Sequence, residues 1–113
     1  MQDKLIIITR IKRTIEYVSK SLDNYPHRHI ELKRRIINDL FDLLEICYLA
    51  NNYYKKEENQ MKCMVKISMI DYYLKISYKK DLISKKKYEG ISRHLLEINK
   101  MITSWRKGSE EKE

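Results

Sequence analysis

The stretch YEGISRHLLEINKMITSW, residues 88–105, decides the fold of this chain. Its apolar residues recur at steps of three and four: Tyr88, Ile91, Leu95, Ile98, Ile102 and Trp105. This spacing places an apolar seam on one side of an α-helix, which buries the seam against neighbouring helices. The residues between the seam positions, such as Arg93, His94 and Glu97, are expected to face water or a partner.

Two helices with the same spacing are predicted in the first half of the chain. Residues 3–23 carry Ile8, Ile11, Ile15, Val18 and Leu22, with Asp3 as a candidate N-cap. This helix ends before Pro26, because the residue preceding a proline avoids the α region. Residues 30–50 form the second helix, with a stripe of Leu32, Ile36, Leu40, Leu43, Cys47 and Ala50.

A third helix is predicted over residues 56–79, with a less regular apolar pattern. Its inner face is expected to consist of Met61, Met64 or Val65, Ser68 or Met69, Tyr72 and Ile76. The next connection covers residues 81–85, in which Ser84 is a good N-cap for the last helix. Gly108 is expected to end that helix at the C′ position.

The composition agrees with a helical protein. The 113 residues include two glycines and one proline, too few for a turn-rich β protein. Four helices of roughly 20 residues with short connections most simply form an all-α, antiparallel up-down-up-down four-helix bundle. We therefore expect one domain, residues 1–107, followed by a charged C-terminal tail, residues 108–113.

Cysteine usage favours a reducing compartment. Cys47 and Cys63 are the only cysteines and do not form a CxxC pair. They are expected to be reduced thiols in the core of a cytoplasmic protein. The apolar run at residues 5–8 is too short for a signal sequence or a membrane span, so no membrane partner is expected.

Positive charge is concentrated near the connection between the last two helices. The chain holds 24 Lys and Arg residues against 16 Asp and Glu residues, a net charge of +8. Within residues 75–87, one acid, Asp81, stands against six lysines: Lys75, Lys79, Lys80, Lys85, Lys86 and Lys87. We predict that these lysines bind RNA or DNA phosphates as mobile point charges, without reading bases. The competing interpretation is a solvated lysine-rich turn.

Four arginines are further candidate nucleic-acid contacts. Arg10 and Arg13 belong to the first helix, and Arg34 and Arg35 to the second. In an up-and-down bundle, Arg10 and Arg13 should lie nearer the end opposite the lysine-rich connection. We expect Arg34 and Arg35 to approach that opposite end too.

No pattern in the chain predicts catalysis. His27 and His29 lack a third metal ligand nearby, so they are interpreted as surface histidines. Asp39, Asp42 and Glu45 share a polar face that is either solvated or receives basic groups from a neighbouring subunit. A hydrolase or nuclease that uses these carboxylates is an alternative that requires divalent metal dependence. We predict no catalytic residues, no cofactor and no metal site.

Two stretches resemble a small bacterial family of four-helix bundle proteins. ISRHLLEINKMITSW, residues 91–105, is similar to the family's closing signature: an apolar stripe, Glu-Ile-Gly-Lys/Arg-Met-Leu, two small residues and Trp. LKRRI at residues 32–36 and LLEI at residues 43–46 resemble its second helix. The family includes the accessory variability determinant of diversity-generating retroelements, with relatives encoded within 23S rRNA intervening sequences. Asn99 stands where the family has glycine, and Thr103 and Ser104 where it has a glycine pair.

The resemblance implies a homopentamer of bundle protomers with a basic surface. It also implies association with a retroelement reverse transcriptase and its template RNA during cDNA synthesis. Arg34 and Arg35 fall where family members often carry a basic residue in the second helix. The resulting expectation is a non-enzymatic accessory protein that binds RNA or cDNA and a reverse transcriptase. The alternative is a structural or protein-interaction oligomer of the rRNA-intervening-sequence type.

Overall fold

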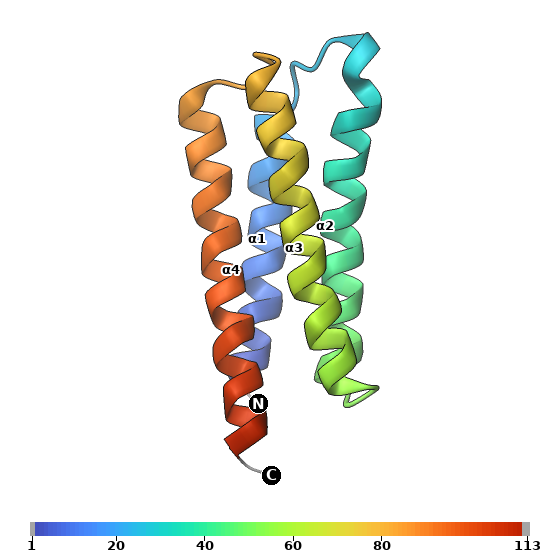
Figure 1. Cartoon of the computed structure of the whole chain (residues 1–113), viewed down its shortest axis with the longest axis vertical. Helices are drawn as coiled ribbons and strands as arrows, with labels where there is room; N and C mark the ends of the chain where they lie inside the picture. Colours follow the sequence, from blue (N-terminus) through green and yellow to red (C-terminus); the bar gives the residue numbers. More distant parts are fainter. Residues whose placement is uncertain (1, 112–113) are drawn as a thin grey trace.

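The computed structural model describes the backbone of residues 2–111 and the side chains of residues 6–108. The helices are α1 (Gln2–Ser21), η1, a 3-10 turn (His27–His29), α2 (Ile30–Asn51), α3 (Lys56–Lys79) and α4 (Lys85–Glu111). Successive α-helices run in opposite directions (Figure 1). Both α1 and α3 pack against α2 and α4. No strand occurs in residues 2–111, so the predicted all-α, up-down-up-down bundle is confirmed.

Three of the four predicted seams form the core. The α1 and α4 seams are buried along their length, except that Tyr88 is half-buried. In α2, the stripe from Ile36 to Ala50 is buried, and Leu32 packs against its edge. Cys47 and Cys63 are free thiols within this core, as predicted. Each buried Leu or Ile side chain contributes about 1.5–3 kcal/mol, so the seams account for most of the bundle's cohesion.

The inner face predicted for α3 is largely wrong, although Met64 and Ile76 are half-buried and Met64 packs against the core. Met61, Val65 and Tyr72 are 47%, 58% and 57% exposed, and Ser68 and Met69 are exposed too. The buried residues are Asn59, Gln60, Cys63, Ile67, Ile70, Leu74 and Ser77. Apolar residues surround the whole of α3, so their spacing does not select one face. Packing against α2 and α4 decides which face of α3 is buried, and the buried face includes small and polar residues.

The helix boundaries are mostly as predicted, with two exceptions at the chain ends. Asp3 lies within α1 and is not its N-cap. The α4 helix continues through Gly108 to Glu111, and Gly108 does not adopt a positive φ, so it is not a C′ residue. At the start of α4 the prediction holds, because Ser84 Oγ accepts a hydrogen bond from the Lys87 N–H at 3.2 Å.

Candidate nucleic-acid interface

The lysine-rich connection is a well-defined turn. Asp81 has a left-handed φ of 58°, and its N–H donates to the Tyr78 carbonyl at 3.0 Å. The Leu82 N–H donates to the Ser77 carbonyl at 2.9 Å. Together these bonds form a Schellman motif, which closes α3. Ile83 then buries its side chain in the core, so the turn is fixed both by its backbone and by an apolar anchor.

Two of the six lysines in this region form ion pairs within their own helix. Lys75 Nζ lies 3.0 Å from Asp71 Oδ2, and Lys85 Nζ lies 3.9 Å from Glu89 Oε1. The hydrogen bond and charge of Asp71 raise the pKa of Lys75 above its ordinary value. Exposed pairs of this kind contribute little, so a polyanion can replace them. Four lysines form no ion pair with any side chain in residues 6–108: Lys79, Lys80, Lys86 and Lys87.

Arg34 and Arg35 lie at the same end of the bundle as the lysines, and not at the opposite end as predicted. Figure 1 shows that α2 and α4 both begin at this end, where α1 and α3 finish. The two arginines occupy the second turn of α2. Arg34 Nη1 lies 3.9 Å from Glu31 Oε2, a loose exposed pair. Arg10 and Arg13 lie near the middle of α1, further from the lysines.

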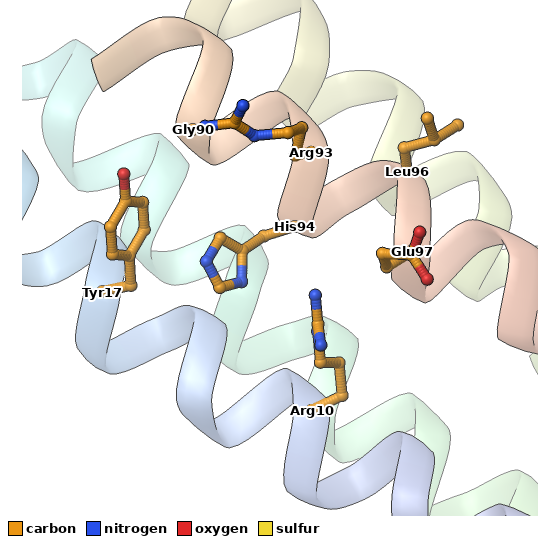
Figure 2. Close-up of a pocket in the computed structure, with 7 residues that line it drawn as sticks. All are labelled: Arg10, Tyr17, Gly90, Arg93, His94, Leu96 and Glu97. Carbon is orange, nitrogen blue, oxygen red and sulfur yellow. The ribbon is translucent and has the colours of Figure 1, made fainter. Parts of the chain in front are cut away.

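Arg10 lines a pocket of about 510 Å³ between α1 and α4 (Figure 2). The full lining is Arg10, Tyr17, Gly90, Arg93, His94, Leu96 and Glu97. The rings of Tyr17 and His94 are stacked, with centroids 4.6 Å apart and an interplanar angle of 27°. A Cβ at position 90 would collide with the Tyr17 hydroxyl, so the missing side chain of Gly90 leaves room for the ring.

His94 is oriented by a hydrogen bond across the pocket floor. Thr14 Oγ1 donates its one proton to the Arg10 carbonyl at 2.9 Å, and lies 3.3 Å from His94 Nδ1. The hydrogen bond is therefore made when His94 carries its proton on Nδ1 and donates it to Thr14 Oγ1, which leaves Nε2 as the unprotonated nitrogen of the neutral ring. Burial lowers the pKa of His94, and the positive charges of Arg10 and Arg93 lower it further. The ring is neutral at pH 7.

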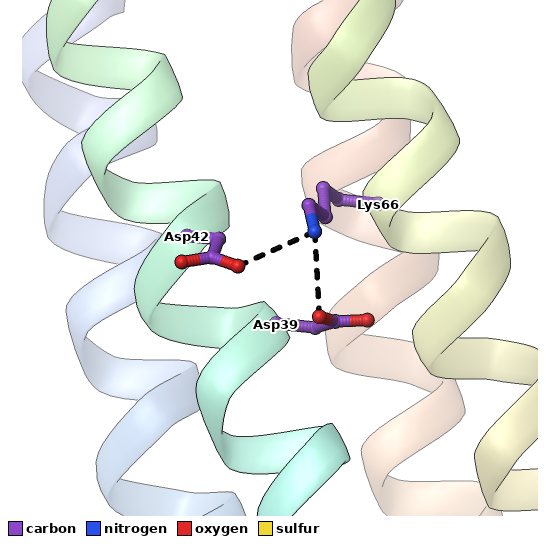
Figure 3. A network of polar contacts seen from close by, with 3 residues as sticks. All are labelled: Asp39, Asp42 and Lys66. Carbon is purple, nitrogen blue, oxygen red and sulfur yellow. Dashed lines mark hydrogen bonds and ion pairs between the residues drawn. The ribbon is translucent and has the colours of Figure 1, made fainter.

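The acidic face of α2 is used inside the protomer. Lys66 of α3 lies with its Nζ 3.4 Å from Asp39 Oδ1 and 3.3 Å from Asp42 Oδ2 (Figure 3). Burial lowers the pKa of Lys66, but the hydrogen bonds and charges of the two aspartates raise it above its ordinary value overall. These carboxylates join α2 to α3, while Glu45 is exposed. Of the two alternatives, a solvated face or basic groups from a neighbouring subunit, neither describes Asp39 and Asp42 fully, because Lys66 of the same chain pairs with both.

The described residues contain neither a candidate metal site nor a helix that could span a membrane. No three His, Cys, Asp or Glu side chains in the described part of the chain are grouped to hold a metal ion. Within the same residues, every helix is too short or too polar to cross a bilayer.

Sequence reasoning did not single out the pocket residues on α4. Arg93 and His94 were assigned only to the surface between seam positions. Their spacing could have indicated a shared basic face, because Lys86 and Lys87 precede Arg93 and His94 by seven residues. Seven residues are about two helical turns, which puts all four side chains on one side of α4. The contribution of Tyr17, from the far end of the sequence, had no such signal.

These features define a class of protein: a small antiparallel four-helix bundle with a cationic end and a basic pocket on the α1–α4 flank. The chain belongs to the bAvd-like family, whose family model matches residues 5–109. The resemblance to the accessory variability determinant is thereby confirmed, and membership supports an accessory protein of this type. A search of curated proteins found no match.

Proposed function

We propose that this protein is a non-enzymatic accessory protein that binds RNA or DNA with one end of its bundle. In a diversity-generating retroelement it would act beside a reverse transcriptase in the cytoplasm, as membership of the bAvd-like family suggests. The observation that carries the proposal is the group of four lysines near the α3–α4 connection that pair with no acidic side chain among residues 6–108. Arg34 and Arg35 add positive charge at the same end of the bundle.

The physical basis of this binding is electrostatic. Lysine ammonium groups on a fixed turn neutralise phosphates and release condensed counterions, so the affinity falls as salt rises. Such contacts hold the backbone of the nucleic acid and do not distinguish bases. The expected behaviour is therefore binding that is sensitive to salt and tolerant of sequence.

Fluorescence anisotropy with a labelled single-stranded RNA tests the proposal. The logarithm of the affinity should fall linearly with the logarithm of salt between about 50 and 200 mM, with a slope of about −0.7 per neutralised phosphate. Replacing Lys79, Lys80, Lys86 and Lys87 by Gln should make the slope shallower by about 3. The matched control replaces four exposed lysines elsewhere on the bundle: Lys55, Lys62, Lys100 and Lys107.

The control separates local charge from total charge, because both quadruple variants lose four positive charges. If the two variants bind RNA equally well, the lysine end is not the interface. If the wild-type affinity does not change with salt, electrostatic attachment is refuted altogether. Circular dichroism at the assay temperature establishes that both variants keep their helical content.

We also propose that the protein is a homo-oligomer, with the pentamer that the family resemblance implies. Support comes from the exposed side of α3, where apolar residues recur at steps of four, four and three: Met61, Val65, Met69 and Tyr72. An exposed apolar stripe of this length is a common mark of a protein–protein contact. Oligomerisation would also combine several weak phosphate contacts into a tighter attachment.

The same stripe favours the second candidate function, a structural or protein-interaction oligomer whose lysines only confer solubility. Light scattering separates the possibilities. Val65→Lys should lower the molecular mass of the assembly, whereas Ser104→Lys on the exposed side of α4 should leave it unchanged. An oligomer that retains no RNA at low salt would establish the second function. A monomeric wild type would refute oligomerisation.

A further inference from the structure

We propose that the pocket between α1 and α4 is a phosphate-binding site, in which Arg10, Arg93 and His94 hold a phosphodiester of the bound nucleic acid. The identity of the ligand rests on the proposed function. The pocket itself is separate from the lysine end and contains residues from both the first and the last helix (Figure 2). Its capacity for phosphate is therefore tested independently.

The pocket carries an excess of positive charge, with two arginines in its lining against one acid, Glu97. Arg10 and Arg93 both line it, and neither forms an ion pair with a side chain in residues 6–108. Glu97, at the edge, lies 3.9 Å from Lys100 and pairs with it. The Arg10 Nε is buried and has no hydrogen-bond partner among the described atoms. Because this atom has no exposed surface, an anion in the pocket would reach it only after the Arg10 guanidinium turns towards the pocket, a movement that phosphate binding would favour.

The chemistry of the lining residues favours phosphate. A guanidinium group presents paired N–H donors that match two oxygens of a phosphate. His94 adds a third donor only after its Nε2 is protonated. In the empty pocket, burial and the charges of Arg10 and Arg93 oppose that protonation. The negative charge of a phosphate bound between these groups would favour the protonated form of His94, so ligand binding would raise the pKa of His94.

Every charged or titratable group near His94 enters this balance. From α1 these groups are Arg10 and Tyr17, with Thr14 fixing the tautomer. From α4 they are Arg93 and Glu97. Glu97 is the single acid in the lining and opposes an incoming anion. Binding of phosphate is therefore expected to take up a proton at His94, and to strengthen as pH falls.

The surroundings of the pocket favour a chain of phosphates over a lone anion. Lys86 and Lys87 precede Arg93 and His94 by seven residues on α4, a rise of about 10 Å along the helix. A row of cations thus leads from the pocket to the lysine end. A nucleic-acid strand can occupy both places at once, whereas a free phosphate ion can occupy only one.

The first test follows the Cε1–H resonance of His94 by NMR, assigned by its loss in His94→Gln. A single-stranded RNA oligonucleotide, and separately inorganic phosphate, should raise the pKa of His94. The double variant Arg10→Gln and Arg93→Gln should abolish this rise and weaken RNA binding by on the order of tenfold or more. The double variant Lys55→Gln and Lys107→Gln, at two exposed lysines away from the lysine end, is the control for loss of two positive charges.

The second test measures RNA affinity against pH, between about 7.5 and 5.5, where a histidine changes charge. The wild-type affinity should rise several-fold as pH falls, and His94→Gln should remove that rise. The control His27→Gln with His29→Gln should keep it. Glu97→Gln should tighten binding at all pH values, because it removes the acid that faces the anion.

The outcomes separate the pocket from the proposed function. If RNA binds but the pKa of His94 does not move, and the double arginine variant binds like Lys55→Gln with Lys107→Gln, the pocket is overturned and the proposed function stands. If RNA does not bind, the proposed function fails, and the titration with inorganic phosphate then decides whether the pocket binds phosphate. A phosphate-induced rise in the pKa of His94 supports the site, and no change overturns it.

Discussion

Two adjacent buried residues of α3 differ in hydrogen bonding, which gives a sharp test of the core. Asn59 Nδ2 donates to the Tyr54 carbonyl at 2.7 Å. Gln60 is fully buried, and neither Nε2 nor Oε1 of its side chain has a partner among the described residues. We predict that Gln60→Met stabilises the protein, whereas Asn59→Leu destabilises it.

The magnitude follows from the cost of unpaired buried groups. Each such group costs about 1–3 kcal/mol, and an imperfectly fitting methionine loses up to about 1.5 kcal/mol. The two unpaired groups together cost about 2–6 kcal/mol, so Gln60→Met should raise the free energy of unfolding by at least about 0.5 kcal/mol. For a domain of this size, that corresponds to a rise in melting temperature of at least about 2 °C. Asn59→Leu should lose about 1 kcal/mol with its hydrogen bond.

The assay is thermal and urea unfolding followed by circular dichroism, with all proteins at one concentration because the proposed oligomerisation would shift the midpoint. Asn59→Leu is the matched control, since it replaces a buried amide one residue away. A Gln60→Met midpoint at or below that of the wild type would mean that the amide is hydrogen-bonded in solution. That result would refute the reasoning.

Three other predictions follow from local features. Burial raises the pKa of Cys47 and Cys63 to about 12, so a thiol reagent at pH 8 should label neither in the folded protein and both in denaturant; rapid native labelling would contradict this. Unfolded thiols ionise first, so they lower the free energy of unfolding as pH rises from about 9 to about 12. Asp81→Gly should raise the free energy of unfolding by about 0.5–1 kcal/mol, because glycine adopts the left-handed φ of this position without strain. The control Asp81→Asn removes the same charge and should raise the free energy of unfolding by less. Equal increases in thermal unfolding experiments would assign the effect to charge. Gly90→Ala should displace the Tyr17 ring and thereby shift the NMR resonances of His94, which stacks on it. The free energy of unfolding should change by less than about 1 kcal/mol, because the higher helix propensity of alanine offsets the lost stacking. Unchanged His94 resonances would contradict the contact.

The predictable part of the fold is the part with a clear period. In α1, α2 and α4, the steps of three and four residues identify the buried side, and the structure confirms it. In α3 the period is blurred, and a residue such as Val65 is as apolar as the buried Ile67. Which of the two faces the core depends on the shapes of α2 and α4, and that information is absent from the α3 sequence.

The candidate interface was predicted to a similar extent. The lysine cluster is contiguous in the sequence, so its residues must lie together around one turn. The acids that pair with Lys75 and Lys85, Asp71 and Glu89, lie just outside the 75–87 segment and were not included in the prediction. Gly108 shows the limit of a local signal in another way, because a glycine is tolerated within α4 at a cost of only about 1 kcal/mol, so it does not end the helix.

Sequence by itself determined four helices, their order and the positive charge near the α3–α4 connection, because these depend on neighbours within a few residues. Tertiary structure alone decided which face of α3 is buried and which residues meet across helices. Arg10 and His94 are 84 positions apart, yet the antiparallel packing of α1 and α4 brings them to one pocket. Helical periodicity is a property of one segment, whereas the depth at which two segments face each other is set by the packing of the whole core.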